Sequence, residues 1–265
     1  MQHLLDLDEI YVLGTNCVDN SPTPEAAQRF LQEGVQVDTN SEQVKGYEFM
    51  QDFQVHVKTD KEYIQRPYFS LPGTIAAPSI ATSCLACFDY TNALADVVVG
   101  YMGAPLESGS RMDESYNTLT IRNERGSQMV QTALQANRLT LGGVATGSGA
   151  HEPLAMTTVK ADSIVLGMVN EPVPEQGMPV WAGRILAMII TNFVSPKGLN
   201  FGKYSIDYHI LRNYLHILKE WGDERAQQHM PQAARDIVQK YLNDEKDDTM
   251  RELVAKIESL KAKKQ

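Results

Sequence analysis

The strongest structural signal lies in residues 83–100, which begin Ser83-Cys84-Leu85-Ala86-Cys87-Phe88-Asp89-Tyr90-Thr91-Asn92 and end in the apolar run Val97-Val98-Val99-Gly100. Two cysteines stand in a polar loop, and the short apolar run that follows predicts a buried strand. A similar arrangement occurs near the start, where Cys17 lies in Gly14-Thr15-Asn16-Cys17-Val18-Asp19-Asn20, directly after the strand-like residues 10–13. All three cysteines of the chain are therefore expected in polar loops beside predicted strands.

The setting of the cysteines favours a bound iron–sulfur cluster, and other chemistries also fit the pattern. Backbone N–H groups in Gly-, Asn- and Thr-rich loops can point at sulfur, which is how proteins hold a cluster and tune its potential. A lone C-x-x-C also occurs in zinc sites and redox dithiols. Structural zinc commonly takes two close ligand pairs, whereas this chain has one. A redox dithiol should precede a helix, and residues 80–90 precede a helix-like segment. The remaining alternative is that the cysteines are inert.

The composition is that of an ordinary globular protein. The chain has 265 residues, of which 43% are apolar and 22% charged, enough for one or two domains. Its net charge of −9 argues against nucleic-acid binding, which needs a basic surface. An odd number of cysteines fits a reducing compartment better than a disulfide framework. No signal or transit peptide is evident at the start, and the longest apolar run, 185–190, is too short to cross a bilayer.

The order of predicted elements indicates a mixed α/β fold that ends in a helical region. In chain order we expect a strand, a loop and a helix over residues 10–32, a β-hairpin over 47–71, strands over 96–100 and 118–122, a helix over 125–135, a Gly- and Ser-rich loop over 140–153, helices over 185–194, 204–221 and 231–242, and an amphipathic segment over 250–260. These elements predict an α/β core over residues 1–180 and a helical region over 181–265.

Two of these predictions concern local detail. Ser21 is the expected N-cap of the first helix, and Pro22 fits its first turn. The hairpin should consist of two long strands, residues 47–58 and 63–71, joined at residues 59–61.

Several motifs together resemble one protein family. They are Gly14-Thr15-Asn16-Cys17-Val18-Asp19-Asn20, Tyr47-Glu48-Phe49-Met50-Gln51-Asp52, the run from Cys84 to Asp96, Gly100-Tyr101-Met102-Gly103, Ile121-Arg122-Asn123-Glu124-Arg125-Gly126, Ser195-Pro196-Lys197-Gly198-Leu199 and Tyr204-Ser205-Ile206-Asp207-Tyr208-His209. Over about residues 8–243 the chain resembles the chlorophyll-metabolism branch of the beta-subunit family of deazaflavin-dependent hydrogenases and dehydrogenases. That branch includes the ferredoxin-dependent divinyl chlorophyllide reductases and the 7-hydroxymethyl chlorophyll a reductases.

The resemblance implies a flavin and iron–sulfur reductase with the fold of the C-terminal domain of the family's beta subunits. Members carry FAD and 4Fe–4S clusters, accept single electrons from reduced ferredoxin, and deliver electron pairs and protons to a chlorophyllide-type pigment. Full-length members have a further N-terminal region with more cysteines, so the chain is expected to be the C-terminal catalytic part. The expected location is the cytoplasm of a cyanobacterium, or the chloroplast stroma of an alga, with peripheral thylakoid association as an open option.

The resemblance implies that Cys17, Cys84 and Cys87 bind the cluster. A 4Fe–4S cluster normally takes four cysteine ligands. The fourth ligand is expected from the region that would precede this chain, or from Asp19 or Asp89.

The candidate cofactor-binding residues flank the cysteines and follow the strand at residues 118–122. They are Thr15, Asn16, Thr91, Asn92, Asp96, Arg122, Asn123 and Arg125. Asn and Thr side chains could donate hydrogen bonds to sulfur or flavin. The arginines could bind a flavin phosphate or a pigment propionate. Loop capping by Asn and Thr, surface ion pairs by Arg and a capping role for Asp96 are the structural alternatives.

The proton donor is sought among the acidic and aromatic side chains near the cysteines. Reduction of a vinyl group needs a proton at one carbon. Asp89 and Tyr90 are the preferred candidates, and Tyr101 and His209 are also available. The apolar residues 185–194 would either line a slot for the macrocycle or belong to the core.

The resemblance leads to one principal hypothesis and three alternatives. The principal hypothesis is reduction of the C8 vinyl group of divinyl (proto)chlorophyllide. The first alternative is reduction of 7-hydroxymethyl chlorophyll to chlorophyll a. The second is a non-catalytic electron-transfer subunit, and the third is a fragment that lacks activity without its N-terminal half.

Overall fold

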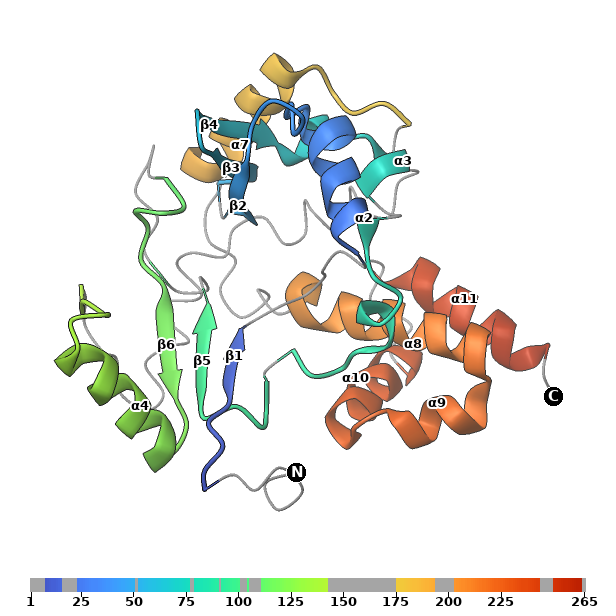
Figure 1. The fold of residues 1–265 in the computed structure, drawn as a ribbon. Helices are drawn as coiled ribbons and strands as arrows, with labels where there is room; N and C mark the ends of the chain where they lie inside the picture. Colours follow the sequence, from blue (N-terminus) through green and yellow to red (C-terminus); the bar gives the residue numbers. More distant parts are fainter. Residues whose placement is uncertain are drawn as a thin grey trace. The chain divides into compact units, whose positions relative to one another are not determined.

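The computed structural model describes residues 8–15, 23–50, 52–76, 79–90, 92–100, 104, 111–142, 175–193, 203–243 and 250–263. They belong to two compact units: residues 1–17 with 89–158, and residues 18–88 with 159–265. We describe each unit by itself. Each contains a three-stranded sheet, and helices complete both (Figure 1). The mixed α/β fold is thereby confirmed, whereas the expected division at residue 180 stays a prediction.

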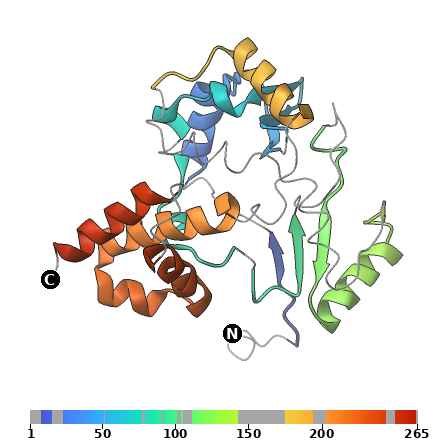
Figure 2. The ribbon, with the colours of Figure 1, turned by 180° about the vertical axis from the view of Figure 1, so that it is seen from behind.

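The first unit is built on a mixed sheet in the order β1-β5-β6. Strand β1 (Leu13–Thr15) pairs in parallel with β5 (Val97–Gly100), and β5 pairs antiparallel with β6 (Thr118–Ile121). The apolar run of the central strand is buried, as expected for a strand covered on both faces. Helix α4 (Glu124–Gln135) lies alongside β6 in both views (Figures 1 and 2).

Helix α4 begins against the start of the central strand, at Asp96 and Val97. The Asn123 side chain accepts a hydrogen bond of 2.9 Å from the Gly126 backbone N–H and so caps the helix. Gly126 is buried against the Asp96 carbonyl group and Val97, where an added Cβ atom would collide with backbone. The absence of a side chain at Gly126 therefore sets the closeness of helix and strand.

The second unit contains an antiparallel sheet in the order β2-β3-β4. Its strands are β2 (Val44–Phe49), β3 (Gln54–Thr59) and β4 (Tyr63–Pro67). On one face, Val55 and Val57 are fully buried against Phe30, Leu31 and Val35. These last residues belong to the π-helix η1 (Phe30–Val35), which continues α2 (Pro24–Arg29).

The expected long strand over residues 47–58 is wrong, because the chain turns within it. Phe53 adopts a left-handed conformation with φ of 61°, and β2 and β3 then pair with each other. The Asp52 carboxylate accepts the Gln54 backbone N–H at 3.2 Å, which stabilises the turn. The segment is therefore a three-stranded meander instead of a single hairpin.

The first helix begins later than expected. Thr23 is the N-cap and accepts the Ala26 N–H at 3.2 Å, and Pro24 occupies the first turn. The Ser21 and Pro22 of the prediction lie outside the described residues. The helix therefore starts with a hydroxyl N-cap followed by proline, as predicted, but two residues later in the chain.

The C-terminal part of the second unit is helical, as expected. Its helices are η6 (Lys203–Tyr208), α8 (His209–Trp221), α9 (Asp223–His229), α10 (Gln232–Asn243) and α11 (Arg251–Ala262). Helix α8 is central among them, since Leu211, Tyr214, Ile217 and Leu218 are fully buried. Gly222, with φ of 85°, ends α8 in a backbone conformation that only glycine adopts readily.

Helix α7 (Val180–Phe193) covers the predicted apolar segment and starts five residues earlier. Gly183, Ala187 and Ile190 are buried, so one face of the helix belongs to the core. Trp181 and Phe193, near the two ends of the helix, are exposed. Among the described residues, no helix combines the length and apolar character needed to cross a membrane. The short elements η2 (Tyr68–Ser70), α3 (Gly73–Ala76) and η4 (Cys84–Ala86) follow β4 in the chain, and η2 contacts α7 while η4 contacts α8.

We predict that Gly126→Ala lowers the free energy of unfolding by about 1–3 kcal/mol, the usual cost of overpacking. Alanine favours a helix over glycine, so the loss would come from the clash with the Asp96 carbonyl group alone. Urea unfolding followed by circular dichroism measures the change, with Gln128→Ala on the exposed face of α4 as the control. A Gly126→Ala chain as stable as the control would contradict this packing.

Candidate functional site

Cys84 and Cys87 lie in one tight turn of the second unit. The turn η4 closes with a 3.2 Å hydrogen bond from the Cys87 N–H to the Cys84 carbonyl oxygen. Cys84 is half-buried and Cys87 is exposed, and the two form no disulfide. Two thiol groups are therefore presented together at the surface of this unit.

The donor chemistry of the turn fits an iron–sulfur cluster in part. Thiolates are the ligands that such clusters take, and Cys84 and Cys87 supply two of them. Within the part of the chain that the structure describes, no group of three or more His, Cys, Asp or Glu side chains gathers as a metal site. The expected ligand Cys17 and the alternative Asp19 lie outside the described residues.

Sequence reasoning missed Asn213, which holds this turn from helix α8. Its Nδ2 group donates to the Cys84 carbonyl oxygen at 2.9 Å and to the Cys87 carbonyl oxygen at 2.7 Å. A signal was present, because Asn213 is the polar exception at the helical spacing of Ile210, Tyr214 and Ile217, which are buried.

In the first unit, Asp96 forms a polar centre between the sheet and helix α4. Its carboxylate accepts hydrogen bonds from the Val12 N–H at 2.8 Å and the Asn123 Nδ2 group at 2.6 Å. Arg125 adds an ion pair, with Nη2 3.1 Å from the same carboxylate. Asp96 is 0% exposed, so its charge is neutralised by its own chain. This arrangement corresponds to the capping role considered as the alternative for Asp96.

These contacts stabilise the ionised form of Asp96. The hydrogen bond from Asn123, followed by that from the Val12 N–H, holds the pKa of the Asp96 carboxyl below its usual value. Arg125 acts in the same direction.

Two side-chain hydrogen bonds fix the loop before Asp96. Asn92 adopts a left-handed conformation with φ of 51° and donates from Nδ2 to the Thr15 carbonyl oxygen at 2.6 Å. The Asp89 carboxylate accepts the Ala93 N–H at 2.9 Å. Asp89 therefore caps its own loop, whereas Asn92 joins this loop to Thr15 at the end of β1. Tyr90 is half-buried in the same loop.

The remaining candidates differ in how far the structure describes them. Arg122 and Arg125 have exposed side chains, and the Arg122 N–H donates to the Asp96 carbonyl oxygen at 3.0 Å. Asn16, Thr91 and Tyr101 lie outside the described residues. His209, the alternative proton donor, is buried at the start of α8 with its ring against Tyr208. The structure thus brings Asp96, Asn123 and Arg125 together in one unit and Cys84 with Cys87 in the other.

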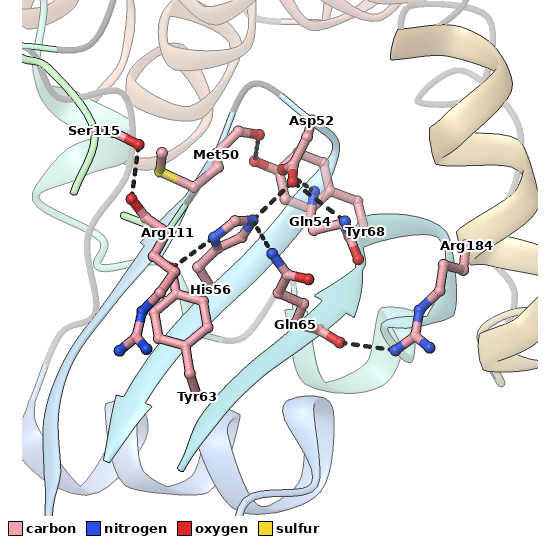
Figure 3. A network of polar contacts seen from close by, with 10 residues as sticks. All are labelled: Met50, Asp52, Gln54, His56, Tyr63, Gln65, Tyr68, Arg111, Ser115 and Arg184. Atoms are coloured by element: carbon pink, nitrogen blue, oxygen red, sulfur yellow. Dashed lines mark hydrogen bonds and ion pairs between the residues drawn. The ribbon is translucent and has the colours of Figure 1, made fainter. Parts of the chain in front are cut away.

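A buried histidine on β3 is a second feature that sequence reasoning missed (Figure 3). His56 is fully buried on the face of the sheet opposite Val55 and Val57. Its Nε2 atom lies 2.8 Å from the Asp52 carboxylate, and its Nδ1 atom lies 2.7 Å from the Tyr63 hydroxyl group. The sequence signal was an aspartate four residues before a histidine in a strand.

The two partners of His56 define its protonation pattern. An ionised Asp52 can only accept, so Nε2 carries the hydrogen that donates to it. In this tautomer, Nδ1 is the atom that can accept a hydrogen bond from the Tyr63 hydroxyl group. The Gln65 side-chain nitrogen, 3.4 Å from Nε2, is a poor hydrogen-bond partner in this tautomer. Asp52, His56 and Tyr63 therefore form an ordered hydrogen-bonded chain within the second unit.

We predict that Asp96→Asn destabilises the protein most at neutral pH. Because the folded pKa of Asp96 is lowered, its contribution is fully present above the unfolded pKa of about 3.9 and is lost as pH falls through the folded value. The difference in unfolding midpoint between wild type and Asp96→Asn should therefore be largest above about pH 5 and shrink in acid.

Thermal unfolding at pH values from 3 to 7 tests this prediction, with Glu258→Gln on the exposed face of α11 as the control. A difference that stays constant across the range would mean that the Asp96 charge contributes nothing.

Comparison with known proteins identifies relatives over nearly the whole chain. The chain is 41% identical over 254 residues to the chloroplastic 7-hydroxymethyl chlorophyll a reductase of Oryza sativa subsp. japonica, covering 94% of this chain and 51% of that protein. It is 35% identical over 238 residues to an uncharacterized protein of Nostoc sp. strain PCC 7120, covering 89% of this chain and 53% of that protein. The chain therefore spans about half the length of these curated relatives.

A family model also matches residues 1–146, which include the first unit's sheet and the C-x-x-C turn. The model describes the C-terminal part of the beta subunit of coenzyme F420 hydrogenase/dehydrogenase. The chain belongs to this coenzyme F420 hydrogenase/dehydrogenase beta-subunit family.

Proposed function

We propose that the chain is the C-terminal part of a flavin and iron–sulfur reductase that acts on a chlorophyll-type pigment. The observation that carries the proposal is the C-x-x-C turn, whose cysteines form no disulfide, in a chain 41% identical to a relative named as a chlorophyll reductase. Membership of the hydrogenase/dehydrogenase beta-subunit family supports oxidoreductase chemistry. Reduced ferredoxin is the proposed electron donor.

Cys84 and Cys87 would bind a 4Fe–4S cluster together with Cys17. The fourth ligand would come from Asp19, Asp89 or a segment outside this chain. When bound, the cluster would carry single electrons between the donor and the flavin. The exposure of Cys87 supports this role, because a cluster that accepts electrons from a protein partner has to lie near the surface.

Arg122 and Arg125 are the best candidates to bind the phosphates of FAD or an acidic group of the pigment. Both side chains are exposed, and guanidinium groups suit phosphate and carboxylate oxygens. In this proposal Asp96 and Asn123 are positioning residues, since their contacts hold Arg125 and the start of α4. When bound, FAD would convert single electrons into pair transfer. Thr15, Asn16, Thr91 and Asn92 remain proposed contributors to the same site.

Asp89 and Tyr90 remain the proposed proton donors. The Ala93 N–H occupies one oxygen of the Asp89 carboxylate. Its other oxygen is the one we assign to proton transfer, because a protonated carboxylic acid or a phenol can act as a general acid.

The named relative favours one of the two pigment reactions. Reduction of a 7-hydroxymethyl group consumes an electron pair and two protons and releases water, leaving a methyl group. Reduction of a C8 vinyl group consumes the same electrons and protons and leaves an ethyl group. The rice relative carries the name of the first activity, so we propose 7-hydroxymethyl reduction ahead of the divinyl chlorophyllide reduction expected from the sequence.

We predict that Cys84→Ser and Cys87→Ser each remove most of the iron that the chain binds. Anaerobic reconstitution with iron, sulfide and FAD, followed by gel filtration, gives iron and flavin per chain. Ser83→Ala, a change in the same turn that leaves both thiols in place, is the matched control and should keep wild-type iron. Equal iron in the control and both cysteine variants would show that the turn is not the cluster site.

Incubation with reduced ferredoxin and each pigment separates the candidate reactions. We expect loss of 7-hydroxymethyl chlorophyll a and formation of chlorophyll a, measured by chromatography. Turnover of the divinyl pigment alone would assign C8 vinyl reduction. Flavin reduction without turnover of either pigment would favour an electron-transfer protein, or a chain that needs the missing half of its relatives.

A further inference from the structure

Helices α8 and α9 bind the backbone of the C-x-x-C turn at the carbonyl groups of Cys84, Ala86 and Cys87. Asn213 contributes two of these hydrogen bonds and His229 contributes the third. The partners of Asn213 lie 129 and 126 residues away in the sequence. The helical region therefore holds the turn through contacts between residues far apart in the sequence. These contacts reach both cysteines and Ala86, which lies between them.

Asn213 is well suited to hold both cysteine residues at once. Its side chain is fully buried, and an amide nitrogen carries two hydrogens. One hydrogen serves each cysteine carbonyl, so both donors of the amide are used on the turn. The Oδ1 atom accepts from Arg212 Nε at 3.1 Å, which fixes the orientation of the amide. A buried amide without such partners would be costly, so the turn and the helix stabilise each other.

His229 supports the turn from the end of α9. Its Nε2 atom lies 2.7 Å from the Ala86 carbonyl oxygen. A carbonyl oxygen only accepts, so Nε2 carries the hydrogen. The imidazole ring packs edge-on against Trp221 at 5.0 Å and Phe88 at 5.9 Å between ring centroids. These rings restrict the orientation of His229 and therefore the direction of its hydrogen bond.

We propose that Asn213 is a positioning residue for the Cys84 and Cys87 thiols, and that His229 assists it. Fixing the carbonyl groups of both cysteines fixes the peptide planes beside each Cα atom, and with them the directions in which the two side chains leave the backbone. The thiols are then held in place before any cluster binds. The role of Asn213 toward a bound cluster rests on the proposed function, whereas its effect on the two thiol groups does not.

Thiol alkylation of the metal-free 265-residue chain tests the proposal directly. In the wild type, half-buried Cys84 should react with iodoacetamide more slowly than exposed Cys87. Asn213→Leu removes both donors and should raise the Cys84 rate about tenfold, since the turn then opens more easily, while the Cys87 rate changes little. Peptide mapping by mass spectrometry gives both rates in the same sample.

Three further variants separate positioning from folding. Asn213→Asp keeps the shape of the side chain without its donors and should match Asn213→Leu. His229→Phe keeps the ring but loses the hydrogen bond and should raise the Cys84 rate less, whereas His229→Gln keeps a donor and should restore part of the wild-type rate. His229 is exposed, so these last two changes leave the buried core intact. Unchanged Cys84 rates in the His229→Phe chain and in every folded Asn213 variant would overturn the proposal.

Iron reconstitution then separates this proposal from the proposed function. If the wild type binds a cluster, Asn213→Leu should shift its electron paramagnetic resonance spectrum and its reduction potential relative to the wild type. An identical spectrum and potential would contradict positioning of the cluster ligands. If no chain retains iron, the cluster function fails, and the alkylation rates still decide whether Asn213 holds the turn.

Discussion

The two N–H groups of Asn213 connect the C-x-x-C turn to the helical part of the second unit. Without this amide, the carbonyl groups of Cys84 and Cys87 would each lose a donor, and without the turn the buried Nδ2 group of Asn213 would lose these two acceptors. The central helix is otherwise apolar on its buried face, apart from His209 at its first residue. One buried polar contact thus couples the packing of the helices to the geometry of the two thiols. A buried polar side chain also joins elements of the first unit, where the Asp96 carboxylate binds Val12 before β1 and the start of α4.

Sequence patterns predicted most helices and strands because these elements depend on residues that lie close together in the chain. The apolar spacing that identified α4 and α10 depends on residues three and four apart, and the helices follow it. The start of α2 was placed early because Ser21-Pro22 and Thr23-Pro24 carry the same capping signal. The turn between β2 and β3 was missed because it depends on the left-handed conformation of Phe53, for which a bulky residue gives no sequence warning.

At the candidate site, the contacts that could not be predicted join residues that are far apart in the sequence. The cysteine pair and the loop that contains Asp89 and Asn92 could be recognised from residue types alone. Asn213 could not be assigned to the turn, because no local pattern reports a contact across 129 residues. For Asp96 the sequence offered cofactor binding and a capping role as alternatives. In the structure its carboxylate accepts hydrogen bonds from the Val12 N–H and from Asn123, as in the capping role. His56 was overlooked because its partner Tyr63 lies on the neighbouring strand.

In the proposed function, the C-x-x-C turn holds an iron–sulfur cluster in a flavin-containing reductase. The most direct test is the electron paramagnetic resonance spectrum of the wild-type chain, reconstituted with iron and sulfide, desalted and reduced with dithionite. The expected result is a signal typical of a reduced 4Fe–4S cluster, with an intensity that corresponds to the bound iron. A desalted chain that retains no iron and gives no signal, even when the part of its relatives that it does not span is supplied, would contradict this role of the turn.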